Sequence, residues 1–417
     1  MSLGRAVLAL ILLASGASAS AQSLPRATPE SVGLSSERLA RVTARLQGHV
    51  DDGDIAGVVA GVVRHGRLVY LEAVGQQDLE VGRPMGEDAL FRLYSMTRPI
   101  TSLAAMILWE EGKFQLDDPI SRYLPEFASQ RVFADAAQPS MDRTQRRDGE
   151  ITVEHLLLHT SGMGSRSSGI YRAEGVRSRS ISVRQMVDNA ARVPLFEHPG
   201  TRWRYGISTT ILGRLVEVWS GMPLQDFLQE RVFGPLGMDD AGFWVEPARA
   251  DRLAVVYRPS PEGDLRPHQI EDVPFTERPT LIEGGVGLVS STMDFLRFSQ
   301  MFLGGGELDG KRVLRPETVA LMTVNRVPDA LLPLGFGRPM LGTGWSLGFS
   351  VVMDAEEYAY TVSDGEFWWD GSAGTRFWID PVEDMVTIVM AQASPASGNG
   401  FREEFKTGVY DAIMGRR

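Results

Sequence analysis

The segment of this sequence best suited to chemistry is Tyr94-Ser95-Met96-Thr97-Arg98-Pro99. Apolar residues recur at helical spacing after Ser95, which predicts a helix that begins there and ends near Gly112. Arg98 then lies one turn after Ser95 on the same face. Backbone N–H groups at a helix start can stabilise an oxyanion, and a nearby positive charge can hold a base or a phenol in its ionised form. Taken alone, however, the spacing favours an N-cap serine followed by a solvent-exposed arginine.

Two other segments match hydrolase motifs literally. Gly344-Trp345-Ser346-Leu347-Gly348 has the Gly-x-Ser-x-Gly pattern, in which the serine must lie on a sharp turn between a strand and a helix. Because the flanking residues predict a continuing strand, Ser346 is not expected to be a nucleophile. Lys406-Thr407-Gly408 lies in a predicted closing helix, nine residues from the end of the sequence, and has no strand to lie on.

The histidines and cysteines point to no further catalytic group. None of the 6 histidines is expected to complete a catalytic triad. His155 and His159 are four residues apart, as helical metal ligands can be, but Leu156 stands where the His-Glu-x-x-His motif needs glutamate. A packed helix that ends at Thr160-Ser161-Gly162 is the preferred interpretation. With no cysteine, the chain has no thiol nucleophile and no disulfide, and we expect neither a metal nor a cofactor.

Several motifs together carry a resemblance to a known superfamily. Ser95-Met96-Thr97-Arg98, followed by Pro-Ile-Thr, resembles the Ser-x-x-Lys element of class C β-lactamases, D-alanyl-D-alanine peptidases and family VIII carboxylesterases. The resemblance is closest to the family VIII esterases and covers almost the whole mature chain. Its other parts are ITVEHLLLHTSGM at 151–163, WRYGISTTILGRLVEVWSGMPL at 203–224, GGVGLVSSTMDFLRFSQMFLGGGELDG at 284–310 and WWDGSAGTRFWIDP at 368–381.

This resemblance implies a role for each matching position. Ser95 is the nucleophile, and Tyr205 is the phenol that relays protons to and from the leaving group. Trp369-Asp370-Gly371 resembles the third element of the superfamily, which is Lys-Thr-Gly in lactamases and Trp-x-Gly or His-x-Gly in the esterases. It contacts the substrate together with Ile207. The N–H groups of Ser95 and Ser372 form the oxyanion hole.

Three departures from the superfamily pattern affect the expected chemistry. Arg98 replaces the lysine that helps to take the serine proton, and arginine stays protonated. Loss of a general base costs about 10² to 10⁴ in rate, whereas each oxyanion-hole donor contributes about 10² to 10³, so residual catalysis is expected. Ile207 replaces the asparagine of the lactamase Tyr-x-Asn element, and Trp369 stands in place of lysine. Both changes remove polar groups that would recognise a β-lactam, which favours small acyl esters as substrates.

A more specific hypothesis concerns the base that replaces the lysine. If Arg98 lies close to Tyr205, its charge should depress the pKa of the phenol, because a unit charge at about 4 Å is worth roughly 4 kcal/mol at an effective dielectric of 20. Tyr205 phenolate would then be the base around neutral pH.

The elements that must position these residues form two groups. A helix over 34–51 and a hairpin over 55–63 and 68–74, with His65-Gly66 at its turn, begin a sheet. Between 96 and 280 the sequence predicts helices and loops, with no convincing strand pair; the helices cover 153–159, 181–190 and 209–220. Strand patterns return at 345–352, 358–362, 375–379 and 385–391, before a closing helix over 401–413.

The predicted fold class is α/β plus all-α, a sheet flanked by helices with an inserted helical subdomain. The α/β subdomain comprises 22–95 and 281–417, and the mainly helical subdomain comprises 96–280. A ligand site is expected in the cleft between them. The resemblance specifies an antiparallel sheet and the β-lactamase/transpeptidase-like fold.

The N-terminal residues 1–21 have the features of a secretory signal peptide. Arg5 supplies one positive charge, the apolar run covers 6–14, and small residues follow at 17–21. The apolar run has roughly half of the about 20 residues that a membrane span needs. The mature domain, 22–417, is therefore expected to be periplasmic or secreted, with no membrane span. Its acidic balance, a net charge of -11 for the whole chain, argues against nucleic acid or anionic lipid as a partner.

Three functions are consistent with these observations. The preferred one is a serine hydrolase, a carboxylesterase that acts on small-molecule, short-chain esters through an acyl-Ser95 intermediate. The second is a pseudoenzyme that has lost its chemistry through Arg98 and binds a cell-wall fragment, a peptide or a protein. The third is a weak β-lactamase or D-amino-acid peptidase. The intact Ser95, Tyr205 and Trp369-Asp370-Gly371 argue against complete loss of activity.

Overall fold

One antiparallel sheet forms the centre of the fold. The computed structural model describes residues 23–358, 360–396 and 398–415, so the expected signal peptide lies outside the described residues. Eight strands pair in the order β14-β15-β16-β17-β18-β1-β2-β3, and every neighbouring pair is antiparallel. Their bounds are β1 (Gly57–Arg64), β2 (Arg67–Asp78), β3 (Arg83–Pro84), β14 (Thr343–Trp345), β15 (Ser350–Val352), β16 (Phe367–Asp370), β17 (Arg376–Asp380) and β18 (Met385–Ala391).

The two ends of the chain meet in the middle of this sheet. β1 pairs with β18 from Val58 opposite Ala391 to Arg64 opposite Met385. Both strands are buried along almost their whole length, which explains their nearly continuous apolar sequences. The prediction that the outer segments of the chain share one sheet is therefore confirmed.

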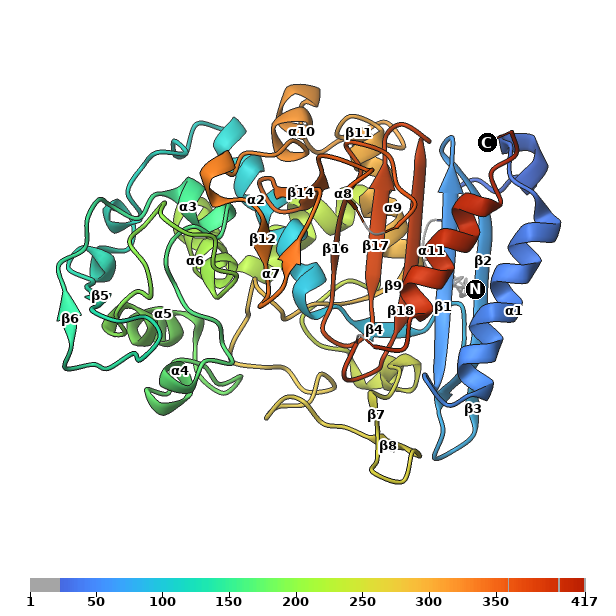
Figure 1. Ribbon diagram of the computed structural model, residues 1–417, viewed down its shortest axis with the longest axis horizontal. Helices are drawn as coiled ribbons and strands as arrows, with labels where there is room; N and C mark the ends of the chain where they lie inside the picture. The colour runs from blue at the N-terminus through green and yellow to red at the C-terminus, as the bar shows by residue number, and fades with distance from the viewer. Residues whose placement is uncertain (1–22, 359, 397, 416–417) are drawn as a thin grey trace, which may run out of the picture.

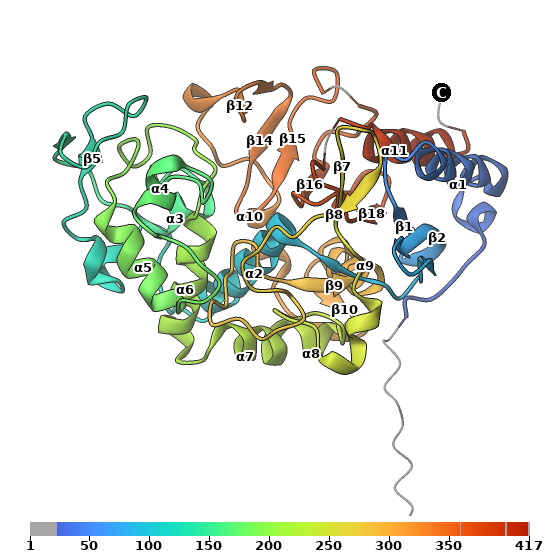
Figure 2. The same ribbon diagram turned by 90° about the horizontal axis from the view of Figure 1, so that it is seen from below.

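Helices cover both faces of the sheet. α1 (Ser36–Asp51) and α11 (Phe401–Asp411) lie side by side on one face, and α9 (Thr292–Leu303) packs against β1 and β18 on the other (Figures 1 and 2). The predicted α/β architecture with an antiparallel sheet flanked by helices is confirmed. Within the described residues, no helix combines the length and the apolar composition that crossing a bilayer requires.

The other long helices lie at the β14 side of the sheet, away from β1 and β2 (Figure 1). α2 (Thr97–Glu110) packs against α6 (Ser208–Ser220), and α3 and α5 pack around α6. The shorter helices are α3 (Val153–Leu157), α4 (Gly169–Ala173), α5 (Val183–Arg192), α7 (Leu224–Leu228), α8 (Gly234–Leu236) and α10 (Pro316–Met322). Single turns are η1 (Pro29–Val32), η2 (Tyr94–Met96), η3 (Ile120–Arg122), η4 (Pro125–Phe127), η5 (Gln229–Phe233), η6 (Pro247–Arg252) and η7 (Asp329–Leu331).

Short strand pairs occur where the sequence predicted none. The prediction that residues 96–280 contain no strand pair is wrong, because β5 pairs with β6 and β7 with β8. Strands of two or three residues are too short to produce an alternating pattern. The small pairs are β4 (Leu90–Arg92) with β9 (Val289–Ser291), β5 (Val132–Phe133) with β6 (Thr144–Gln145), β7 (Tyr257–Pro259) with β8 (Leu265–Pro267), β10 (Glu307–Leu308) with β11 (Lys311–Arg312), and β12 (Leu334–Gly335) with β13 (Pro339–Met340).

The strand predictions near the C-terminal sheet need two corrections. The single strand expected at 345–352 is a hairpin of β14 and β15, because Gly348 has a φ of 126° that turns the chain back. The described residues of 358–362, which are 358 and 360–362, form no strand; the next strand is β16, which begins at Phe367. Ser346 therefore lies in a tight turn, but a strand and not a helix follows it, so it lacks the setting of a hydrolase nucleophile.

A buried polar network fastens α11 to the sheet. Lys406 forms an ion pair with Glu366, and their side chains are 1% and 0% exposed. The Tyr410 hydroxyl donates to Glu366 and also contacts Asp380. Burial lowers the pKa of Lys406 to about 8 and raises the pKa of Glu366, although each charge stabilises the other.

Breaking this pair should destabilise the protein strongly. Lys406→Met leaves the Glu366 carboxylate buried without its cation, and we expect the free energy of unfolding to fall by about 3 to 5 kcal/mol in urea titrations. Adding Glu366→Gln should restore part of the loss. Lys113→Met, which changes an exposed lysine, is the control and should be nearly neutral. A loss from Lys406→Met no larger than that from Lys113→Met would contradict the assignment.

Candidate active site

Ser95 lies in η2, a single 3-10 turn between β4 and α2. The helix itself begins at Thr97, two residues later than predicted, and Ser95 forms no N-cap hydrogen bond. The N-cap interpretation of this serine is therefore wrong. Tyr94, directly before it, has a φ of 44°, a left-handed conformation that a bulky residue adopts only under constraint. Ser95 is half-buried, whereas its neighbours Tyr94 and Met96 are buried.

Arg98 is buried in the cleft and not exposed as the alternative interpretation predicted. Arg98 is 6% exposed, and its guanidinium carbon lies 4.1 Å from the centre of the Tyr205 ring. One guanidinium nitrogen, Nη1, donates to the Gly206 carbonyl at 2.8 Å and to the Thr209 hydroxyl at 3.1 Å. The expected proximity of Arg98 and Tyr205 is confirmed, with the cation against the face of the ring.

The Tyr205 hydroxyl lies where these groups meet. It accepts a hydrogen bond of 2.8 Å from the indole Nε1 of Trp369, at the end of β16. The Ser95 side chain lies close enough to be among the groups that lower the pKa of Tyr205. The fold thus brings Ser95, Arg98, Tyr205 and Trp369 together from η2, α2, the segment before α6 and the sheet.

The ionisation expected for Tyr205 is wrong in its net direction. Burial raises the pKa of Tyr205, and this effect outweighs the charge of Arg98 and the hydrogen bonds from Ser95 and Trp369, all of which lower it. The same burial lowers the pKa of Arg98. Because its pKa is raised, Tyr205 is a neutral phenol near neutral pH. The sequence indicated which charge approaches the phenol, but it did not indicate how completely the phenol is buried.

The third sequence element approaches the nucleophile through its backbone. A Cβ atom on Gly371 would lie 2.4 Å from the Leu93 carbonyl oxygen, so only glycine permits this contact. Ser372 follows directly and is exposed. Asp370 forms an ion pair of 3.2 Å with Arg402. These contacts place the backbone of the third element beside the residues that lead into η2.

Ile207 stands at the start of α6 with its side chain buried. It is 2% exposed, and its N–H donates to the Gly164 carbonyl at 3.0 Å. Its neighbour Gly206 lies against the same carbonyl, where a Cβ atom would come within 2.4 Å. Met163 and Gly164 therefore pack against the backbone that follows Tyr205.

Sequence reasoning missed His159 and Thr209. The His159 ring centre lies 4.6 Å from that of Tyr205, and its Nε2 lies 3.5 Å from the Thr209 hydroxyl. Burial and the charge of Arg98 lower the pKa of His159 well below its ordinary value, so the imidazole is neutral. Its signal was present in the HTSGM part of the resemblance, but the histidine was interpreted as a packing residue.

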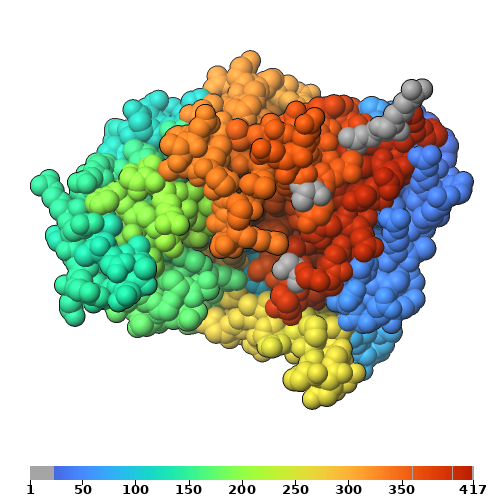
Figure 3. Space-filling model, in the orientation of Figure 1, coloured from blue at the N-terminus to red at the C-terminus, as the bar shows by residue number. Residues whose placement is uncertain are grey.

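Aromatic rings line the cleft around Tyr205. Phe336, between β12 and β13, is 53% exposed, and its ring centre lies 5.2 Å from that of Tyr205. Trp203 and Trp345, both buried, pack behind Tyr205 with ring centres 6.0 and 6.1 Å from its own. In Figure 3 the surface is hollowed near the middle of the face shown, where green, orange, yellow and red parts of the chain meet.

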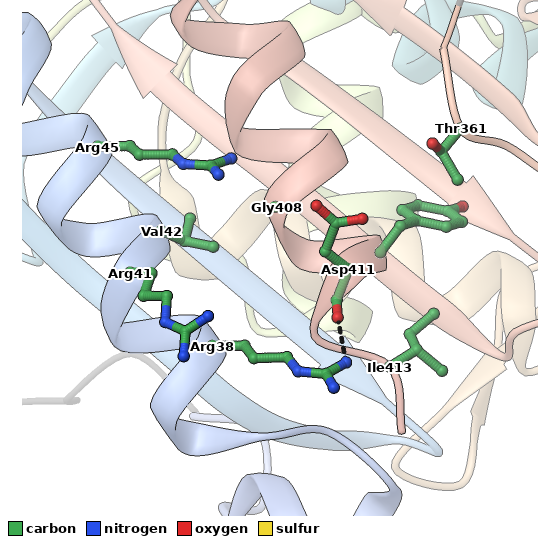
Figure 4. Close-up of a pocket in the computed structure, with 9 residues that line it drawn as sticks. Arg38, Arg41, Val42, Arg45, Thr361, Gly408, Asp411 and Ile413 are labelled. Atoms are coloured by element: carbon green, nitrogen blue, oxygen red, sulfur yellow. Dashed lines mark hydrogen bonds between the residues drawn. The ribbon is translucent and has the colours of Figure 1, made fainter. Parts of the chain in front are cut away.

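A separate groove of about 530 Å³ lies between α1 and α11 on the other side of the molecule from α3 to α6 (Figures 1 and 4). Arg38, Arg41 and Arg45 line it, and Arg38 donates to the Asp411 carbonyl at 2.7 Å. None of the candidate catalytic residues borders this groove. Among the residues that the structure describes, no group of histidines and carboxylates is arranged to hold a metal ion.

Comparison with known proteins agrees with this geometry. A family model described as Beta-lactamase matches residues 42–406. Esterase EstB of Burkholderia gladioli is 32% identical over 380 residues, which cover 85% of this chain and 90% of that protein. Protein Rv1367c of Mycobacterium tuberculosis is 37% identical over 353 residues, which cover 83% and 88%. The solved structure of EstCE1, a hydrolase with promiscuous acyltransferase activity, aligns with a TM-score of 0.78 at 27% identity and covers 89% of this chain and 98% of that one.

The chain belongs to the beta-lactamase family, as the sequence motifs indicated. Its esterase relatives support an esterase-type function within that family of serine hydrolases and acyltransferases.

The hydrogen bond from Trp369 gives a testable effect on Tyr205. Trp369→Phe keeps an aromatic ring but removes the N–H that stabilises the phenolate, so the pKa of Tyr205 should rise by about one unit. The pKa is measured by alkaline titration of the tyrosinate absorbance. The titration curve of the matching Tyr205→Phe protein is subtracted from that of each protein, which leaves the contribution of Tyr205. Trp368→Phe is the matched control, because the Trp368 indole nitrogen has no hydrogen-bond partner among the described residues. An equal shift from both variants would contradict the assigned role.

Proposed function

We propose that this protein is a serine carboxylesterase that acts on short-chain esters through an acyl-Ser95 intermediate. The observation that carries the proposal is the setting of the Tyr205 hydroxyl, which accepts a hydrogen bond of 2.8 Å from Trp369 and belongs to a ring that packs against the Arg98 cation. The Ser95 side chain is close enough to lower the pKa of this phenol. A serine whose proton can pass to a phenol, beside a fixed cation, is the arrangement that acyl transfer needs. The esterase relatives support the same reaction class.

The proposed reaction has two halves. Tyr205 phenolate takes the Ser95 proton as the serine oxygen attacks the ester carbonyl, and the N–H groups of Ser95 and Ser372 stabilise the oxyanion. The carbon–oxygen bond to the alcohol then breaks, and the alcohol leaves with the proton from Tyr205. Water attacks the acyl-Ser95 ester, gives its proton to Tyr205, and returns the serine with that proton as the acid departs.

Arg98 supports this cycle without taking a proton. Its charge, against the ring of Tyr205, favours the phenolate over the neutral phenol, as do the N–H of Trp369 and the hydroxyl of Ser95. Because burial nevertheless raises the pKa of Tyr205, only a small fraction is phenolate at neutral pH. We therefore expect a slow enzyme whose rate increases with pH.

The apolar positions beside the site favour ester substrates over β-lactams. Ile207 and Trp369 stand where the lactamase pattern has an amide and an ammonium group, and aromatic rings line the cleft. EstCE1 is a hydrolase with promiscuous acyltransferase activity. Acyl transfer, in which an alcohol replaces water in the second half of the reaction, is therefore a second candidate function. Because residues 1–21 have the features of a secretory signal peptide, we propose that the enzyme acts in the periplasm or outside the cell.

Hydrolysis of p-nitrophenyl butyrate by the mature protein between pH 6 and 9 tests the proposal. Turnover should disappear in Ser95→Ala and persist in Ser346→Ala, the control at the other serine motif. The rate should increase about tenfold per pH unit across the whole range, because the active phenolate form is the minor form below a raised pKa. A plateau below pH 8 would exclude Tyr205 phenolate as the base. Absence of turnover in all three proteins would favour the pseudoenzyme.

A further inference from the structure

A cluster of arginines surrounds Tyr94, the residue directly before the nucleophile. The Arg166 guanidinium carbon lies 5.6 Å from the centre of the Tyr94 ring. The ring of Phe275, 6.0 Å from that of Tyr94, has Arg179 at 3.9 Å and Arg92 at 5.6 Å. The charges of all three arginines act on the Tyr94 phenol. Positive charge is thus concentrated at one end of the cleft, although the chain as a whole has a net charge of -11.

Two buried carboxylates lie in this region, and Arg166 and Arg177 form ion pairs with them. Glu271 pairs with Arg166 at 2.8 Å and with Arg177 at 2.9 Å. Glu283 pairs with Arg177 at 2.7 Å. Neither glutamate forms an ion pair with Arg92 or Arg179, although the charges of both glutamates reach Arg179.

Arg92 and Arg179 have no carboxylate partner for their guanidinium groups in the part of the chain that the structure describes. Arg92 donates to the Ala254 carbonyl and to the Gln392 side chain. Arg179 is 2% exposed, and its Nε and Nη2 atoms have no hydrogen-bond partner. The nearby Asp272 accepts from the backbone N–H of Arg179 and not from its guanidinium group.

Arginines without a carboxylate partner destabilise the protein when no anionic ligand is bound to them. A buried cation normally forms an ion pair with a carboxylate, because the free-energy cost of removing the cation from water is not otherwise offset. Burial, together with the neighbouring Arg179 charge, lowers the pKa of Arg92 to about 10. Two like charges beside the same Phe275 ring repel each other, and an anion close to them would relieve both the repulsion and the desolvation.

The cluster borders the cleft that contains Ser95. Arg166 comes two residues after Gly164, whose carbonyl contacts the Gly206 and Ile207 backbone beside Tyr205. The Arg166 side chain is 26% exposed, so it forms the accessible end of the cluster. Its charge also acts on Arg98, inside the catalytic group.

We propose that the site selects esters that carry a carboxylate or another anionic group, held at the Arg166 end of the cleft and attracted by Arg92 and Arg179. This inference rests on the esterase function proposed above and specifies its substrate class. Positive charge beside low-dielectric walls focuses its field on the opening of a cleft, and this raises the local concentration of anions. The third sequence element has no lysine, so these arginines supply the positive charge from a different side of the nucleophile.

Paired esters that differ only in charge test the proposal. For the acyl side, mono-p-nitrophenyl glutarate is compared with p-nitrophenyl pentanoate, which has the same chain length. For the alcohol side, the butyrate ester of 4-hydroxybenzoate is compared with that of its methyl ester. In at least one pair we expect kcat/KM to be about tenfold or more higher for the anionic ester at low salt, as a well-placed charge pair produces. The preference should decrease as ionic strength increases.

Variants then assign the preference to the cluster. Arg179→Met and Arg166→Met should each lower, several-fold, the ratio of kcat/KM for the anionic ester to kcat/KM for its neutral partner. Arg67→Met, at an exposed arginine of β2, makes the same change in net charge and should leave the preference intact. Because Arg166 is partly exposed, its variant should fold even if Arg179→Met does not. Equal kcat/KM values for the anionic and the neutral ester in both pairs would overturn the proposal. An equal loss of the preference for the anionic ester in Arg67→Met would also overturn it.

A binding measurement separates this inference from the esterase function. If no ester is turned over, the esterase proposal fails, and the melting temperature of the protein is measured with and without glutarate. Stabilisation by glutarate in the unaltered protein and in Arg67→Met, but not in Arg166→Met, would support an anion site independently of catalysis. No stabilisation by glutarate would overturn the anion site as well.

Discussion

The burial of the Arg98 cation against the ring of Tyr205 is the constraint on which the candidate site depends. A lysine at this position could exchange a proton with the nucleophile, but a guanidinium group cannot, so in the mechanism proposed above proton transfer passes through the phenol. Arg98 also holds the backbone at Gly206 and the hydroxyl of Thr209, which fixes the start of α6 relative to α2. The same side chain therefore links the geometry of the site to its electrostatics.

Three parts of the fold must meet for this contact to form. Ser95 and Arg98 come from η2 and α2, Tyr205 precedes α6, and Trp369 ends β16 in the sheet. Leu93, before the nucleophile, contacts the third element at Gly371, where any side chain would collide with its carbonyl. Tyr94 accepts a left-handed backbone at the same point. Local strain and close backbone packing thus hold the serine in place, and the large core of the sheet and helices stabilises the strained turn.

Much of this could be predicted from the sequence, because motifs and apolar periodicity are local. The residues Ser95, Tyr205 and Trp369 were identified by their motifs, and the shared sheet was inferred from strand patterns at both ends of the chain. The sign of the pKa change at Tyr205 could not be predicted, since it depends on how completely the fold excludes water. The hydrogen bond from Trp369, the neighbouring His159 and the arginines around Tyr94 were also missed. Each depends on contacts between segments far apart in the chain, for which the sequence has no short-range signal.

The central claim is that Ser95 forms a covalent acyl intermediate although arginine replaces the usual lysine. It is tested most directly by mixing the mature protein with p-nitrophenyl butyrate, quenching in acid within the first turnover, and mapping the modified peptide by mass spectrometry. The account predicts a butyryl group on the peptide that contains Ser95 and none on that peptide in Ser95→Ala. A butyryl group on Ser346 or another residue, or continued turnover with Ser95 unmodified at every quench time, would contradict it.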